Sequence, residues 1–450
     1  MPSAKTVARP RESGRLEWFQ VKGFKSHRGG SRVDFRALTV LAGANSSGKS
    51  SVMQPLLMLK QTLHEDRYDP GPLKLDGPNV EFSETSQFFT RDPRKLSIRL
   101  TLGLKHSDVI LTYGREGPGV QLKSTKVRDH DGGEIELSEG KALSVDEVSA
   151  CRGPRSVLTS PLTRIEHNVR WRGARHGIAH RIEFSLEEND SWYDFYDFTT
   201  SPSVHAISGE MLRMIHLSGH RGNPSRRYPR TFNTSEARPG LFHEQVAALI
   251  AHWKKSDHRS FEQLQKAIQT VGLGSMIEPV DIDATSIDLH ISRTRSSSEG
   301  APADLVSIAD VGFGVSQSLP VLVALIDAKP GQLVYIEQPE IHLHPRAQVG
   351  VADLIVEASR RGARVVIETH SEIILTRIQY HVAKGTLPPK DVLVHWFACD
   401  PKTGDTTVTA VEPDAAGAFG DWPVDFAEVG ERVDREYIEA AWKRQSGEAG

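Results

Sequence analysis

The sequence has few of the features that would place the protein in a specialised class. Only 2 of its 450 residues are cysteine, Cys151 and Cys399, and their spacing is not typical of a zinc or redox motif. The longest apolar run, residues 319–326, is too short to span a bilayer. The first residues are basic, but no apolar segment follows them, so no secretory signal is predicted. We therefore expect a cytoplasmic protein without a membrane anchor.

An excess of charge of either sign is also missing. The formal net charge is −3, with 38% hydrophobic and 25% charged residues, which is typical of a globular protein and not of a fibrous or disordered one. The near-zero charge neither favours nucleic-acid binding nor excludes a local basic patch. A chain of 450 residues is long enough to form two or more compact units.

What the sequence does contain is a phosphate-binding loop. The segment GANSSGKSS fits the pattern G-x-x-x-x-G-K-[ST], with Gly43, Gly48, Lys49 and Ser50 at the defining positions. The glycines let backbone N–H groups surround phosphates, and Lys49 supplies a compact positive charge. The Ser50 hydroxyl is a suitable ligand for Mg²⁺. These residue types predict a site for a nucleoside triphosphate.

The surroundings of this loop support the prediction. Residues 38–42 form an apolar run with the length of a buried strand, and residues 51–64 are typical of a helix. A strand, a glycine loop and a helix in this order place the phosphates at a helix N-terminus. The alternative is a Gly/Ser-rich turn that binds nothing.

A second part of the site is predicted far downstream. The apolar run 333–336 is followed directly by Glu337, Gln338, Pro339 and Glu340. A buried strand that ends in a carboxylate is typical of a Walker B segment, in which Glu337 would orient the water shell of Mg²⁺. The alternative is a core strand followed by a charged turn.

Two further segments flank this strand. Residues 311–317 contain two glycines and Ser316 and precede an apolar helix, which predicts a second anion-binding helix N-terminus. Residues 364–371 are typical of a buried strand, and His370 follows its end. The long separation from the phosphate-binding loop favours a domain inserted within the nucleotide-binding fold.

These motifs resemble an ABC-type ATPase of the branch formed by SMC, RecF and overcoming-lysogenization-defect (OLD-like) proteins. In bacteria, single-chain members are known as AAA family ATPases, and some act in anti-phage defence operons. The likeness covers residues 15–90 and 305–425. Six segments carry the likeness. Four correspond to motifs of the branch: residues 18–59, which contain the P-loop; Gly312-Phe313-Gly314, which resembles the signature loop; 336–345, which resembles the extended Walker B segment; and Thr369-His370-Ser371, which resembles the segment with the switch histidine. Residues 216–221 and 421–423 are also similar to those of bacterial ATPases of this type. His342 and His344 fit the extended Walker B segment, although alternating histidines also occur in metal sites.

The resemblance implies an α/β fold, namely an ABC-type P-loop ATPase head with a mixed sheet, flanking helices and an antiparallel β-subdomain, interrupted by an inserted α+β region. We expect a disordered leader at 1–14, the first part of the ATPase domain at 15–94, an inserted β then helical region at 95–304, the second part at 305–400, and a hairpin and helix at 401–450. Within the insertion, antiparallel strands are predicted at 96–102, 109–113 and 181–186, helices at 241–255 and 261–271, and further strands at 275–308. The second helix would be opened by a Ser260-x-x-Gln263 box and closed by Gly272.

The resemblance also implies ATP and Mg²⁺ as ligands, and a head-to-tail homodimer in which two subunits enclose two nucleotides. Asn45 and residues 48–51 would hold phosphate and Mg²⁺ within one subunit. Gly314 and Ser316 would contact the γ-phosphate held by the other subunit, and His370 would hold that phosphate or the attacking water.

One departure from the family pattern bears on activity. Gln338 occupies the position of the usual catalytic glutamate, and a glutamine orients water but takes no proton from it. Either Glu340 serves as the base of an ATP phosphohydrolase, or hydrolysis is slow and ATP acts as a gate. In the signature segment, Gly312 stands where serine is usual, and Ser316 is a candidate substitute.

The expected partners follow from the resemblance and from charge. OLD proteins carry a C-terminal Toprim nuclease domain, but only 80 residues follow His370 here, so a nuclease or toxin is expected in a separate effector protein. Nucleic-acid contact is possible through Arg170 to Arg181 or through the cluster Arg221, Arg226, Arg227 and Arg230, although charge runs are more often solvated faces. The resemblance thus implies an ATPase that acts as the sensor or regulatory subunit of a bacterial anti-phage defence system. The alternatives are a nucleotide-gated scaffold with little turnover and a RecF-like DNA-repair ATPase.

Overall fold

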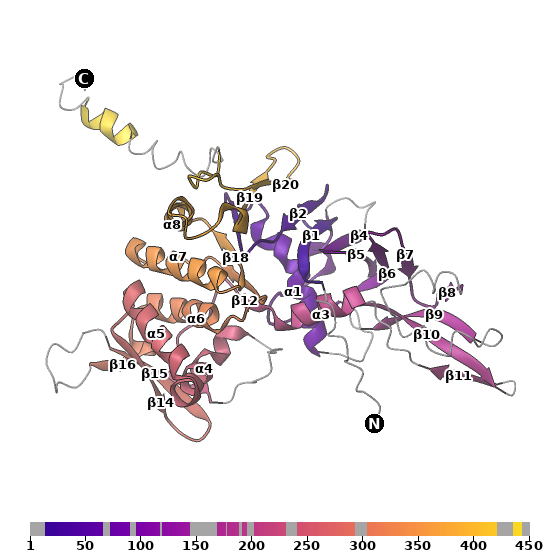
Figure 1. Ribbon diagram of the computed structural model, residues 1–450, viewed down its shortest axis with the longest axis horizontal. Helices are drawn as coiled ribbons and strands as arrows, with labels where there is room; N and C mark the ends of the chain where they lie inside the picture. Colours follow the sequence, from indigo (N-terminus) through magenta and orange to yellow (C-terminus); the bar gives the residue numbers. More distant parts are fainter. Residues whose placement is uncertain are drawn as a thin grey trace, which may run out of the picture. The chain divides into compact units, whose positions relative to one another are not determined.

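The computed structural model describes residues 14–65, 73–90, 96–117, 119–144, 169–176, 178–188, 191–195, 202–230, 241–292, 304–420 and 435–442. For 169–176, 181–188 and 191–195 only the backbone path is described. Three predicted features therefore lie outside the described residues: residues 1–13 of the leader predicted at 1–14, the segment Asp421-Trp422-Pro423, and the side chains of Arg170 to Arg175 and of Arg181. The chain divides into two compact units, residues 1–33 with 54–212, and residues 34–53 with 213–450 (Figure 1).

A mixed sheet forms the centre of the second unit. Its order is β12-β17-β18-β3-β19-β20; the first five strands are parallel, and β20 runs antiparallel to β19. The strands are β12 (Ile215–Leu217), β17 (Leu333–Glu337), β18 (Arg364–Thr369), β3 (Leu38–Gly43), β19 (Val392–Cys399) and β20 (Thr406–Val411). β3 and β18 are buried along their whole length, as expected for continuous apolar runs in a parallel sheet. Strand β12 shows that the span 95–304 contributes to this sheet.

Helices pack beside this sheet in the second unit. They are α4 (Phe242–Ser256), α5 (His258–Val271), α6 (Phe313–Asp327), α7 (Pro345–Arg360) and α8 (Glu372–Ala383). In Figure 1, α5, α6, α7 and α8 follow one another in a layer, and each contacts the next. Their apolar faces share one core with the central strands.

The start of α5 differs from the prediction. The helix begins at His258, and its N-cap is Asp257, whose carboxylate accepts hydrogen bonds from both the N–H and the hydroxyl of Ser260. Both residue types are good caps, but Ser260 lies within the first turn of the helix, where it donates to Asp257. The predicted end is confirmed, because Gly272 adopts φ +79° at the C-cap.

A small sheet completes the second unit. β15 (Ser286–Ser292) pairs with β14 (Met276–Asp281), β13 (Tyr228–Pro229) and β16 (Leu305–Ser307). The strands predicted between residues 275 and 308 are thereby confirmed.

The first unit contains two sheets. One has the order β2-β1-β4-β5-β6-β7, with strands β1 (Leu16–Lys22), β2 (Ser31–Asp34), β4 (Ser97–Leu104), β5 (Ser107–Glu116), β6 (Gly119–Asp129) and β7 (Glu134–Leu137). Pairing from β1 through β7 is antiparallel, and β4 alternates between exposed and buried side chains as its sequence predicts. The other sheet has the order β11-β10-β9-β8, formed by β8 (Ala142–Leu143), β9 (Val169–His176), β10 (Ala179–Glu188) and β11 (Ser191–Phe195). Helix α3 (Pro202–Arg213) follows.

Helix α1 (Lys49–Glu65) follows the P-loop and continues through Pro55. The observed elements confirm the predicted fold class, an α/β protein with a mixed sheet, flanking helices and an antiparallel β-subdomain. Among the described residues, no helix has the length and apolar character needed to cross a membrane.

Candidate nucleotide site

The P-loop joins β3 to α1 in the second unit and depends on its glycines. Gly43 has φ +146°, and a Cβ atom there would lie 2.2 Å from the backbone oxygen of Phe397 on β19. Gly48 has φ +99°, and Ser46 has φ +60°. These positive φ values turn the backbone sharply between strand and helix, so the glycines of the motif are required by the backbone path.

Lys49 lies inside this turn. Its side chain is buried, with the residue 3% exposed, and Nζ donates to the carbonyls of Gly43 at 3.0 Å and Ala44 at 2.6 Å. Burial lowers the pKa of the lysine, while the charges of Glu368 and Glu340 act in the opposite direction. The ammonium group is therefore held at the loop by carbonyl oxygens that a phosphate could replace.

Ser50 is held by an acidic residue at the end of another strand. Its hydroxyl donates to Oε1 of Glu368 at 2.6 Å, and the hydroxyl of Tyr335 donates to Oε2 of the same carboxylate at 3.0 Å. Burial raises the pKa of Glu368, against the effect of these hydrogen bonds. Glu368 thus links helix α1 to β17, the predicted Walker B strand.

Glu337 ends β17 and has different partners. Its Oε1 accepts from Nε2 of His216 at 3.1 Å, and its Oε2 accepts from the N–H of Gly219 at 3.0 Å. Burial alone would raise the pKa of this carboxyl group. The hydrogen bonds from His216 and Gly219 and the charge of Arg221 outweigh burial and lower it. Glu337 is accordingly favoured as a carboxylate.

Gln338 follows in a strained conformation. Its φ is +44°, which is uncommon for a residue other than glycine, and its N–H donates to the carbonyl of Glu368 at 2.7 Å. The guanidinium of Arg221 donates to the carbonyls of Glu337 and Gln338. Backbone contacts from two elements thus hold the turn after β17.

Glu340 and His370 lie together beyond that turn. The N–H of His370 donates to Oε1 of Glu340 at 2.8 Å. Burial raises the pKa of Glu340, although this hydrogen bond acts against the rise. Burial and the charge of Lys49 lower the pKa of His370, while a hydrogen bond to the Gly43 backbone raises it. The strand-end histidine therefore contacts the P-loop backbone and favours the neutral form.

The remaining predicted residues have local partners. The hydroxyl of Ser51 donates to the carbonyl of Gly48 at 2.9 Å, and Asn45 is exposed. At the start of α6, the hydroxyl of Ser316 donates to the carbonyl of Phe313 at 3.1 Å. A Cβ atom on Gly314 would lie 3.2 Å from the backbone oxygen of His342, so a glycine is favoured there.

Arg221 does not fit the nucleic-acid contact that the sequence predicts for the arginine cluster. It is only 4% exposed, and burial lowers its pKa to about 10. Its guanidinium also donates to the carbonyl of Gln317 on α6 at 3.2 Å. A buried side chain used in this way is not available to a nucleic-acid backbone.

The other arginines of the cluster are more exposed and carry acidic partners. Ion pairs join Arg226 to Asp310, Arg227 to Asp283, and Arg230 to Asp281. These aspartates offset the positive charge that the sequence pattern suggested.

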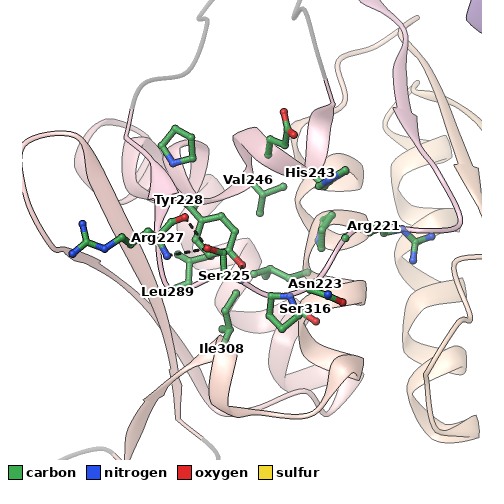
Figure 2. Close-up of a pocket in the computed structure, with 17 residues that line it drawn as sticks. Arg221, Asn223, Ser225, Arg227, Tyr228, His243, Val246, Leu289, Ile308 and Ser316 are labelled. Atoms are coloured by element: carbon green, nitrogen blue, oxygen red, sulfur yellow. Dashed lines mark hydrogen bonds between the residues drawn. The ribbon is translucent and has the colours of Figure 1, made fainter. Parts of the chain in front are cut away.

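A cavity of about 430 Å³ lies beside the arginine-containing segment 221–230. Residues of this segment line it, together with residues of α4, β15 and α6 that include His243, Val246, Leu289 and Ser316 (Figure 2).

Glu337 and Glu368 are held by hydrogen bonds from His216 and Tyr335, among others. Of these four residues, only Glu337 was predicted as a site residue. The signal for Glu368 is present in the sequence, since it lies two residues before His370 at the end of a predicted strand. Tyr335 stacks on His216 with 5.4 Å between the ring centroids, so the ring that holds Glu368 also contacts the histidine that holds Glu337.

The fold and the P-loop geometry define a P-loop protein of the α/β class, in which the loop joins a buried strand to a helix. The model of the family described as "AAA domain, putative AbiEii toxin, Type IV TA system" matches residues 38–116 and 225–376, slightly more than half of the chain. The chain belongs to this family. No curated protein matches it.

Among solved structures, similar chains are SMC heads. The SMC head domain from Thermotoga maritima has 13% identity and a TM-score of 0.35, with 88% of this chain and 99% of that chain covered. An SMC head bound to the C-winged helix domain of ScpA has 12% identity and a TM-score of 0.43, with 89% and 99% covered. A Pyrococcus furiosus SMC head with an extended coiled coil, bound to the C-terminal domain of ScpA, has 10% identity and a TM-score of 0.39, with 89% and 96% covered.

Proposed function

We propose that the protein binds and hydrolyses ATP as an ABC-type ATPase. The observation that carries the proposal is the meeting of the P-loop with the carboxyl end of β18, where the hydroxyl of Ser50 donates to Glu368. Glu337 on β17 is the register partner of Glu368, and the charge of Glu368 acts on Lys49. Ligands of open α/β sheets bind beyond the carboxyl ends of the parallel strands.

The residues present fit ATP and Mg²⁺. The hydroxyl of Ser50 and the carboxylate of Glu337 are hard oxygen donors of the kind that Mg²⁺ prefers, and Mg²⁺ in such sites takes one or two carboxylates in addition to phosphate oxygens. The bound ion would neutralise charge on the phosphates. In this proposal Gly43, Asn45 and residues 48–51 hold the phosphates, with Lys49 exchanging its carbonyl partners for a phosphate oxygen.

The residues after the strands would act on water and phosphate. Gln338 orients the attacking water, Glu340 accepts its proton, and His370 holds the γ-phosphate. The raised pKa of Glu340 supports its role, because a base with a raised pKa accepts a proton more readily. Contact of His370 with the Gly43 backbone supports a place beside the phosphates.

We further propose that ATP joins two copies of the chain head to tail. Gly314 and Ser316 would contact the nucleotide of the other subunit from the N-terminus of α6, where backbone N–H groups favour an anion. Phe313 supports this surface, since it is 54% exposed at the same helix end and lies near the ring of His342.

The proposed biological role is that of the regulatory ATPase in an anti-phage defence system. Support comes from the family description, which refers to a putative toxin and a type IV toxin–antitoxin system. In this role the ATPase controls a separate nuclease or toxin. A RecF-like role in DNA repair has less support, because Arg221 is buried and the neighbouring arginines are paired with aspartates.

Phosphate release at saturating ATP and Mg²⁺ tests the proposed activity. We expect steady turnover by the parent protein and its loss in Lys49→Ala, with Lys402→Ala on the β19–β20 hairpin as a charge-matched control that keeps parental turnover. A Lys49→Ala variant that is folded and equally active would overturn the proposal.

A nucleotide-gated scaffold is the second candidate, and Gln338 is the observation that favours it. In that case ATP would hold the dimer together with little turnover. Light scattering separates the two candidates: a dimer that persists for hours in ATP and Mg²⁺, without phosphate release, would identify the scaffold.

A further inference from the structure

The inference concerns Glu368 and rests on the proposed ATP site. Strand β18 lies between the Walker B strand β17 and the P-loop strand β3. In the register of these parallel strands, Glu368 is the partner of Glu337 on one side and of Leu41 on the other. Residues in register on parallel neighbours project from the same face, so two carboxylates leave the sheet side by side next to the P-loop.

Burial of the Glu368 carboxylate costs desolvation free energy, which its contacts must offset. The residue is 3% exposed, and its two oxygens accept from the hydroxyls of Ser50 and Tyr335. Removing a carboxylate from water is costly unless it is hydrogen-bonded and paired with a cation. The hydroxyls satisfy the first requirement, and Lys49 meets the second in part, because its charge is shared with the loop carbonyls.

The hydrogen bond from Ser50 has a directional consequence. A serine hydroxyl carries one proton and two lone pairs. Because the proton points to Glu368, the lone pairs are available on the other side of the oxygen. Glu337 does not provide this orientation, since its oxygens accept from His216 and Gly219.

We infer that Glu368 positions Ser50 as a Mg²⁺ ligand and is a second carboxylate of the metal's surroundings, supplied by β18. In this arrangement both carboxylates lie beside the metal. The orientation of Glu337 is set by its hydrogen bond with His216, and that of Glu368 by its hydrogen bond with Tyr335. Partners that orient metal ligands typically change metal affinity 10- to 100-fold when they are removed.

ATP binding with and without Mg²⁺ tests this assignment. Titration calorimetry would be performed in EDTA and in excess Mg²⁺ on the parent, on Glu368→Gln, and on Glu412→Gln as a control for loss of one surface carboxylate. We expect Mg²⁺ to strengthen ATP binding by the parent and by Glu412→Gln. In Glu368→Gln this gain should fall by about 10-fold or more, while affinity in EDTA stays within about 3-fold of the parent. Binding of Mn²⁺, followed by electron paramagnetic resonance in the presence of ATP, should weaken in parallel.

A double-mutant cycle distinguishes action through Ser50 from a general structural effect. If Glu368 works by orienting Ser50, then Glu368→Gln should have little further effect on Mg²⁺-dependent binding in a Ser50→Ala background. If Glu368→Gln does not fold, Glu368→Asp replaces it, because the shorter side chain keeps the charge but draws the oxygen away from Ser50.

Two results would overturn the assignment. One is a Mg²⁺-dependent gain in Glu368→Gln equal to that of the parent, and the other is full additivity of the two substitutions. A parent protein that binds no ATP in either buffer would instead refute the proposed function on which the inference rests.

Discussion

The backbone N–H of His370 donates a hydrogen bond to Oε1 of Glu340 over 2.8 Å, so the end of β18 directly contacts the acid that follows the Walker B strand. The bond ties the orientation of the proposed base to the residue proposed to hold the γ-phosphate. Because His370 uses its backbone for this bond, its imidazole is left for the contact with the Gly43 backbone.

The first prediction concerns this acid. Replacing Glu340 by glutamine keeps an oxygen for the His370 N–H but removes the proton acceptor, so ATP turnover should fall by about 100-fold or more. ATP affinity should change little. Single-turnover phosphate release measures the effect. Gln338→Glu is the matched variant and should raise turnover, since it restores a carboxylate next to Glu337. Unchanged turnover in Glu340→Gln would show that another group takes the proton.

The second prediction concerns dimerisation. Ser316→Glu places a negative charge at the N-terminus of α6, where the phosphate of the other subunit is proposed to bind, and like charges repel at this short range. ATP binding to the monomer should remain, while the ATP-dependent dimer should be lost. Light scattering in ATP and Mg²⁺ on a Glu340→Gln background would report the change. Ser316→Ala should still dimerise, and a stable dimer of Ser316→Glu would place the interface elsewhere.

The third prediction concerns Arg221, which donates to carbonyls on two segments, at Gln317 and at Glu337 and Gln338. We expect Arg221→Met to lose ATP turnover. Arg221→Lys keeps the positive charge but lacks the planar guanidinium that reaches several carbonyls at once, so we expect it to lose turnover as well. Both should lower the free energy of unfolding by about 2–4 kcal/mol, because buried carbonyls lose their donors. Urea unfolding measures the change. Exposed Arg226→Met is the control, with an expected change below about 0.5 kcal/mol.

The fourth prediction concerns pH and the pairing of α7 with α8. Asp353 accepts two bonds from Arg377 and one from His381, at 2.6, 3.0 and 2.7 Å. Burial would raise the pKa of Asp353, but these partners lower it overall. A carboxyl group with a depressed folded pKa stabilises the protein above its unfolded pKa, and the contribution disappears as pH falls through the folded value.

Asp353→Asn should therefore lower the free energy of unfolding by about 1–2 kcal/mol at pH 7, after allowance for partial exposure. The difference from the parent should shrink in acid, below the ordinary pKa of an aspartate. Urea unfolding at several pH values would test it, with Glu357→Gln, an exposed partner of Arg361, as the control. A difference that stays constant down to pH 3 would contradict the predicted linkage.

The elements that carry the P-loop were predictable because their signals are local. The apolar run ending at Gly43 gives a buried strand, and the glycine pattern is set by backbone turns within a few residues. The same holds for β17, β18 and α6, whose apolar runs are bounded by charged or glycine-containing segments.

The partners of the acids were not predictable in this way. Glu368 faces Ser50 because β18 lies between β3 and β17, and strand order depends on contacts between residues far apart in the sequence. In the sequence, Arg221 looks like an exposed residue, because arginine is seldom fully buried. Its burial depends on carbonyls at the start of α6 and the end of β17, which only the assembled sheet brings together.

The size of β12 has a consequence for the carboxylate that His216 contacts. The strand has only three residues, all of them buried, and Nε2 of His216 at its centre lies 3.1 Å from Oε1 of Glu337. Because the same imidazole stacks on Tyr335, whose hydroxyl donates to Glu368, it lies beside the partners of both carboxylates. A substitution in this short edge strand would therefore alter the surroundings of both acids at once.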